Sequence, residues 1–169
     1  MNISALIRNA SRLGIIALAA TGALMAQRTV TVSVAGNELT ATGSATVVLA
    51  SQGDENALGF TMTFDPAVLR FESVTNGADV GGATVHVNAS QSASGRIGLA
   101  LALPSAWSFP AGNRALVVLN FTVLAPSRTS TVVGFADAPI AREVSDPQAR
   151  AMPAQFSGVT VAAGPTPRI

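Results

Sequence analysis

Several residue types are missing from this chain of 169 residues, or nearly so. It has no cysteine, so it can form neither a disulfide nor a thiolate metal site. It also has no lysine and no tyrosine, and only one tryptophan and one histidine. Charged residues make up 11% of the chain and hydrophobic residues 49%, which excludes intrinsic disorder and is typical of one globular domain.

The first 26 residues are typical of an export signal. Arg8 and Arg12 precede the apolar run LGIIALAATGALMA, which is short for a membrane-spanning helix. Ala26 is a small residue before Gln27, although Leu24 departs from the A-x-A rule, so an uncleaved anchor helix is the alternative. Cleavage after Ala26 leaves eight arginines against nine acidic residues, a net charge of −1. We therefore expect a secreted, extracellular protein with no membrane span after cleavage, and the charge argues against a nucleic-acid partner.

Beyond Gln27, the apolar runs alternate with a period of two, which predicts β-strands. The runs are residues 29–34, 57–64, 84–88, 96–103, 117–123, 131–135 and 156–161. Turn-forming residues separate them, and Pro147 interrupts the one stretch that is rich in helix formers. We predict an all-β fold, an antiparallel β-sandwich with jelly-roll topology, over residues 27–163. A signal-peptide helix (1–26) would precede it, and a tail or linker start (164–169) would follow.

The stretch ALGFTMTFDPAVLRFESVTNG, residues 57–77, shows how one strand meets the core. The four large apolar side chains on one side of the alternation are predicted to be buried: Leu58, Phe60, Met62 and Phe64. Asp65-Pro66 ends the strand, because proline cannot donate a hydrogen bond to a sheet. The apolar pattern that resumes at Val68 is predicted to cross to the second sheet or to a corner.

This stretch resembles the cohesin domain, a jelly-roll sandwich related to cellulose-binding modules. The shared pattern is an alternating strand, an aromatic-Asp-Pro corner and a further strand that ends in a Val-Thr-x-Gly turn. GRIGLALAL from Gly95 and ALVVLNFTV from Ala115 extend the resemblance over about residues 30–161. It implies a noncatalytic module that docks a dockerin-like protein partner and is linked to extracellular polysaccharide binding or breakdown. The chain itself contains no D-x-[DN]-x-[DN]-G calcium loop of the dockerin kind.

In cohesins one sheet face receives the helical dockerin module, and the matching strands here would be 57–64, 84–88, 96–103 and 116–123. Their outward residues are mostly small and uncharged, whereas a face meant only for solvent usually carries lysine, glutamate and arginine. The predicted partner-binding residues are Thr61, Thr63, His86, Asn88, Arg96, Gly98, Ala100, Asn120 and Thr122. The prediction requires Thr61, Ala100 and Asn120 to share one exposed plane. The alternative is that loops of the chain, such as residues 103–113, cover this face.

The residues needed for catalysis are sparse. His86 is the only histidine, no nucleophile pattern accompanies it, and no G-x-S-x-G motif occurs. The acids that could form a glycosidase pair lie in turn-like or polar segments: Asp54, Glu55, Asp137, Glu143 and Asp146. Residues 54–56 offer oxygen ligands to calcium, but turns do so by accident, so we do not predict a calcium site there. We therefore predict no catalytic site, no metal site and no cofactor.

Two other hypotheses for the function of the chain stay open. A carbohydrate-binding module would contact glycan through Trp107 and Phe109, which lie in the loop LPSAWSFPAGN. The structural alternative for Trp107 is a plug that closes one end of the core. The second of these hypotheses is a structural domain of a cell-envelope or matrix assembly, which would only self-associate. The sequence does not distinguish a protein ligand from a glycan.

Overall fold

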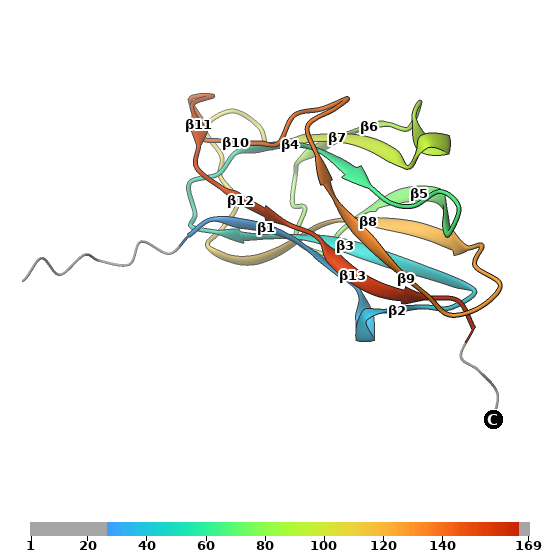
Figure 1. Cartoon of the computed structure of the whole chain (residues 1–169). Helices are drawn as coiled ribbons and strands as arrows, with labels where there is room; N and C mark the ends of the chain where they lie inside the picture. Colours follow the sequence, from blue (N-terminus) through green and yellow to red (C-terminus); the bar gives the residue numbers. More distant parts are fainter. Residues whose placement is uncertain (1–26, 166–169) are drawn as a thin grey trace, which may run out of the picture.

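The structure, a computed structural model, describes residues 27–165. The predicted signal peptide and residues 166–169 of the predicted tail lie outside the described residues. Within residues 27–165 the only helical segments are two short 3-10 turns, η1 (Ala35–Asn37) and η2 (Ser92–Ser94). The strands form two sheets that are packed face to face (Figure 1). The prediction of an all-β sandwich is confirmed.

The first sheet has five strands in the order β12-β1-β3-β8-β5. The strands are β1 (Thr29–Ser33), β3 (Thr42–Ser51), β5 (Leu69–Asn76), β8 (Gly112–Val123) and β12 (Gln155–Ser157). The long antiparallel pair of β3 and β8 forms its centre. The apolar run that begins at Val68 continues into β5, whereas β4 belongs to the eight-stranded sheet, so the predicted crossing from one sheet to the other is confirmed.

The second sheet has eight strands and is organised around β4 (Ala57–Thr63). One edge of β4 pairs along its whole length with β7 (Arg96–Ala102), and β7 pairs with β6 (Thr84–Asn88). The other edge of β4 pairs first with β10 (Glu143–Ser145) and then with β9 (Thr129–Ala136). The sheet continues through β13 (Val159–Ala163) to β2 (Glu38–Leu39), and β11 (Ala151–Met152) pairs with β10. The strand β6 is thus one free edge of the sheet.

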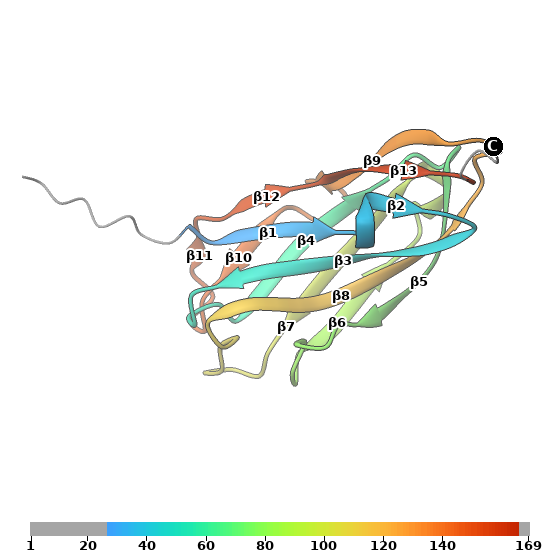
Figure 2. The same cartoon turned by 90° about the horizontal axis from the view of Figure 1, so that it is seen from below.

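Two segments of the chain belong to both sheets. Residues 29–39 run from β1 to β2, and residues 155–163 run from β12 to β13 beside them (Figure 2). The two segments pair in parallel, β1 with β12 and β2 with β13, while all other strand pairs are antiparallel. At the crossing point, a Cβ on Gly158 would lie 2.6 Å from the carbonyl oxygen of Val133, so a larger residue would force a shift. These parallel pairs close one side of the sandwich and are the exception to the predicted antiparallel pattern.

The core lies between the sheets and is built from the inward side chains of both. The four apolar residues predicted from the alternation, Leu58, Phe60, Met62 and Phe64, are all buried. The ring of Phe64 packs edge-on against Phe121 of the opposite sheet, with centroids 5.2 Å apart. Burial of four such side chains stabilises the fold by roughly 6–12 kcal/mol before chain entropy is counted.

The alternation located most strands but missed β3, the long central strand of the five-stranded sheet. Its first half, Thr-Gly-Ser-Ala-Thr, carries small or polar residues on both sides, so no apolar alternation is visible there. The inward residues Ala45, Val47 and Leu49 become recognisable only because β1 and β8 pair on either side of them. Strand propensity depends on such neighbours more than on the segment itself.

Candidate docking surface

The residues predicted to bind a partner do not share one surface. Those from β4, β6 and β7 lie on the outer side of the eight-stranded sheet, as expected. Asn120 and Thr122 belong to β8, which is in the five-stranded sheet. There Asn120 donates a hydrogen bond to Ser73 at 3.1 Å, and Thr122 donates one to Glu72 at 2.7 Å. The predicted plane is therefore wrong for these two residues, because alternation shows which side chains face outward but not which sheet a strand joins.

Part of the remaining face is covered by residues 137–142, which follow β9 and are called the strap here. The buried hydroxyl of Thr61 donates to the carbonyl oxygen of Ile140 at 2.7 Å and accepts from its N–H at 2.9 Å. A Cβ on Gly98 would lie 3.0–3.1 Å from the side chains of Ile140 and Pro139, so the strap sits directly on that glycine. Thr61 and Gly98 are thus unavailable to a partner. A covering loop was the alternative weighed from the sequence, but the segment that covers them is 137–142, not 103–113.

Polar contacts stabilise the conformation of the strap and attach it to the sheet. Arg142 forms two side-chain hydrogen bonds to Asp137, at 2.7 and 2.8 Å, and its N–H donates a third at 3.0 Å. These hydrogen bonds hold the pKa of Asp137 well below its usual range. Arg96 donates to the carbonyl oxygen of Ala138 at 3.0 Å. The predicted partner-binding guanidinium of Arg96 is therefore already engaged with the strap.

A groove remains open beside the strap, with a volume of about 380 Å³. Its floor consists of small residues of β4 and β7, namely Ala57, Gly59, Ala100 and Ala102. The strap residues Ile140 and Ala141 and the β10 residues Glu143 and Ser145 form one wall, and Thr84 and His86 of β6 form the other. Of the predicted partner-binding residues, only His86 and Ala100 line this groove.

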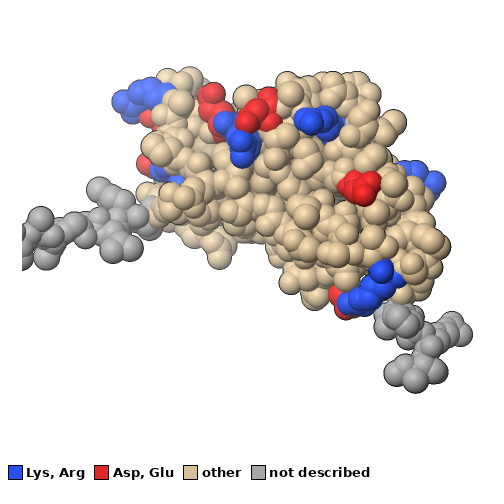
Figure 3. Space-filling model, viewed as in Figure 1, with Lys and Arg blue, Asp and Glu red and all other residues tan. Residues whose placement is uncertain are grey.

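Charge on the surface is sparse and mostly paired, although the groove wall carries the exposed carboxylate of Glu143. In Figure 3 the acidic and basic side chains lie in a few small clusters, and most of the visible surface between them is uncharged. Five exposed or partly exposed ion pairs account for many of these groups: Arg70–Glu72, Arg114–Asp79, Arg128–Glu38, Arg142–Asp137 and Arg150–Asp146. The side chains of Asp54, Asp65 and Glu143 are exposed as well.

The loop after β7 presents Trp107 to solvent, with 62% of the residue exposed. The side-chain amide of Asn56 lies beneath the loop and donates to the carbonyl oxygens of Leu103, Pro104 and Trp107, at 3.3, 3.1 and 2.7 Å. Phe109 is only 1% exposed and belongs to the core. The predicted glycan contact through Phe109 is therefore wrong, because its ring packs inward, and Trp107 does not act as a core plug.

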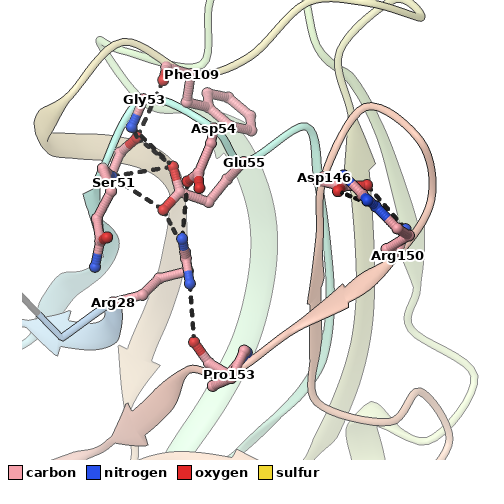
Figure 4. A network of polar contacts seen from close by, with 10 residues as sticks. Arg28, Ser51, Gly53, Asp54, Glu55, Phe109, Asp146, Arg150 and Pro153 are labelled. Atoms are coloured by element: carbon pink, nitrogen blue, oxygen red, sulfur yellow. Dashed lines mark hydrogen bonds and ion pairs between the residues drawn. The ribbon is translucent and has the colours of Figure 1, made fainter. Parts of the chain in front are cut away.

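A buried charge network lies at the same end of the sandwich (Figure 4). Glu55 is fully buried, and its carboxylate accepts hydrogen bonds from Arg28, from the Ser51 hydroxyl at 2.5 Å and from backbone N–H groups of residues 52 and 53. Arg28, only 7% exposed, also contacts Asp54 at 2.8 Å and donates to the carbonyl oxygen of Pro153 at 3.0 Å. The network joins the start of β1 to the turn after β3 and to the segment before β12.

The hydrogen bonds of this network favour the ionised form of the Glu55 carboxylate. Burial on its own would raise the pKa of Glu55, but the hydrogen bonds from Ser51, Gln52 N–H and Arg28 outweigh it and lower that pKa below its usual value. A general acid needs the opposite shift. Sequence reasoning treated Asp54 and Glu55 as turn residues and missed the network, because its basic partner lies 27 positions away from Glu55.

Of the other acids considered for catalysis, Asp137 and Asp146 are engaged in local ion pairs, and Glu143 is exposed. Asp146 accepts hydrogen bonds from Arg150 and from backbone N–H groups in its own loop, which lowers its pKa. Among residues 27–165 no three histidine, aspartate or glutamate side chains lie close enough together to hold a metal ion. Nor does any helix in that part of the chain have the length and apolar character required to cross a membrane.

Comparison with known proteins relates this architecture to solved structures. No family model and no curated protein sequence matches the chain. A non-cellulosomal cohesin from the archaeon Archaeoglobus fulgidus superposes with a TM-score of 0.66 at 13% identity, over 83% of this chain and 93% of that one. The chain has the fold of a cohesin module.

Two further cohesins show the same similarity. A cohesin module of a family 33 glycoside hydrolase from Clostridium perfringens gives a TM-score of 0.66 at 13% identity, over 82% of this chain and 98% of that one. The sixth cohesin of scaffoldin B from Acetivibrio cellulolyticus, solved in complex with a Cel5 dockerin mutant, gives 0.61 at 15% identity, over 78% and 96%. The resemblance stated from residues 57–77 is thus confirmed at the level of the cohesin fold.

Proposed function

We propose that the chain is an exported, noncatalytic docking module that captures a dockerin-like protein module in the groove beside the strap. The observation that carries the proposal is the groove floor. It consists of alanine and glycine on a rigid sheet, with an apolar wall at Ile140 and a polar wall at Thr84 and His86. Small floor residues let the backbone of a docked helix approach closely, and Glu143 is the one charged residue in the groove lining, so docking desolvates little charge. Cohesins of this fold have been solved with dockerins, which supports the same kind of partner here.

The proposed binding residues are fewer than the sequence suggested. Ala100 and His86 contribute the floor and one wall, whereas Thr63, Asn88 and Arg96 lie outside the groove lining. These three residues would contact only a partner that extends beyond the groove. An association with extracellular polysaccharide breakdown would then belong to the protein that carries the partner module.

The test uses the chain from Gln27 immobilised on a resin and exposed to the secreted proteins of the organism that makes it. We expect capture of a protein that contains D-x-[DN]-x-[DN]-G loops, and release of that protein by a calcium chelator. Ala100→Arg should abolish capture, because the new side chain fills the groove. Thr46→Arg places the same side chain on the outer surface of the five-stranded sheet and should leave capture unchanged. Capture that is equal for both variants would exclude the groove.

Glycan binding is a second candidate function, favoured by the exposure of Trp107 on a loop that Asn56 holds in place. An exposed indole on a fixed loop can stack on a sugar ring. Because the chain has one tryptophan and no tyrosine, its intrinsic fluorescence reports on Trp107 alone. Titration with soluble polysaccharides should change the emission, and Trp107→Ala should lose retention on the insoluble forms. No change with any glycan would remove this candidate.

A further inference from the structure

The free edge of the eight-stranded sheet is formed by β6, and it lacks the features that normally protect such an edge. This strand, Thr-Val-His-Val-Asn, pairs only with β7 among the described residues. All five of its residues are exposed or partly exposed, and Val87 leaves 45% of its surface uncovered. No charged residue and no proline occurs between Asp79 and Arg96. Natural sheets usually block an open edge with charge, proline or extreme shortness.

The other sheet edges of this molecule do carry such protection. The strand β5 carries the ion pair of Arg70 and Glu72, and β2 carries Glu38. The strand β11 has two residues and lies between Arg150 and Pro153, and β12 has three residues. The five-residue strand β6 is therefore the one unprotected edge of comparable length within residues 27–165.

The sequence of β6 is nearly symmetric about His86. If a second copy pairs with it antiparallel and centred on His86, Val85 faces the partner's Val87, and Thr84 faces the partner's Asn88. Every opposed pair then matches apolar with apolar or polar with polar. Side chains directly opposite each other in antiparallel strands have Cβ atoms about 4.5–5.5 Å apart, so the partly exposed valines would cover one another.

We propose that two copies of the chain associate through β6 to form one continuous sheet across both molecules. A two-fold axis through the His86 pair makes the contact self-complementary and closes it at a dimer. The axis is perpendicular to the sheet, so both grooves open on the same side of the dimer. A partner assembly that carries two dockerin-like modules would then bind both grooves of one dimer. This bivalent attachment would raise its apparent affinity for the dimer.

The pairing is short, so the association is expected to be weak. Five residues on each side bury less than the standard interface of about 1,600 Å², and contacts at the low end of the size range are transient. Sedimentation equilibrium of the chain from Gln27 should therefore cover about 10 µM to 1 mM. We expect the average mass to rise from monomer towards dimer and no further.

A charge-swap experiment tests both the edge and its register. His86→Lys and His86→Asp should each remain monomeric over the whole range, because like charges would face each other across the axis. An equimolar mixture of these two variants should form a heterodimer, because the opposed charges now attract. Thr75→Lys places a charge on the β5 edge and should behave like the unmodified chain. Circular dichroism of each variant confirms that the exposed substitution leaves the fold intact.

Each outcome decides the proposal. A monomeric unmodified chain at 1 mM, or a mass that rises beyond the dimer, would overturn it. Dimerisation of His86→Lys alone would overturn the assigned edge, and failure of the mixture to dimerise would overturn the register about His86. None of these measurements involves a dockerin-like partner, so the docking function stands or fails independently.

Discussion

Replacing Arg28 with alanine tests the buried charge network most directly. Within residues 27–165 the guanidinium is the only counter-ion in contact with the buried carboxylate of Glu55, and the substitution removes it. Loss of one partner of a buried ion pair generally costs about 3–5 kcal/mol, because the other charge is left in a low-dielectric environment. The carboxylate keeps the Ser51 hydroxyl and the N–H groups of residues 52 and 53, so we expect the low end, about 3 kcal/mol.

Thermal and urea unfolding of the chain from Gln27 would measure this effect. A loss of about 3 kcal/mol should lower Tm by roughly 10 °C for a domain of this size. Arg70→Ala is the matched control, because it breaks the exposed pair with Glu72 and should leave Tm nearly unchanged. A change below about 1 kcal/mol in Arg28→Ala would refute the reasoning, since the pair would then behave like a surface contact.

The pH dependence provides an independent check on the same network. The folded state lowers the pKa of Glu55, so its contribution to stability is full above the unfolded value of about 4.3 and is lost as pH falls through the folded pKa. Protonation neutralises the carboxylate and removes the need for Arg28. The difference in stability between the unmodified chain and Arg28→Ala should therefore shrink as the pH falls below about 4. A difference that stays constant down to pH 3 would show that lost packing, not charge, causes the effect.

Three further substitutions test other parts of the structure. Phe60→Asp places a charge in the centre of the core and should abolish soluble expression, and a soluble folded variant would contradict the assigned faces of β4. Thr61→Val removes the hydroxyl that forms hydrogen bonds with both backbone groups of Ile140. We expect a loss of about 1–3 kcal/mol in the free energy of unfolding and faster amide hydrogen exchange in the strap. Unchanged exchange would contradict the anchoring role of Thr61. Asn56→Ala frees three carbonyl oxygens beneath the Trp107 loop, so the fluorescence anisotropy of the single tryptophan should fall, and unaltered anisotropy would show that other contacts hold the loop.

The sequence was sufficient to predict which side chains of β4 face inward. Strand side chains alternate strictly, so the apolar positions of residues 57–64 could point only to the core once the segment was recognised as a strand. The aromatic-Asp-Pro corner likewise marked the end of β4, because proline cannot take part in the sheet. The β-sandwich followed from such local patterns, and the cohesin likeness was a resemblance of the sequence of residues 57–77.

Contacts between distant segments were decided by the tertiary structure alone. The membership of β8 in the five-stranded sheet moved Asn120 and Thr122 to the opposite surface, and the strap buried Thr61 and Gly98. Arg28 and Glu55 form a buried pair although neither position is distinctive in the sequence. Alternation along a strand is a property of neighbouring residues, so it predicts orientation. Sheet membership, covering loops and ion pairs depend on which segments meet after folding, and no local pattern carries that information.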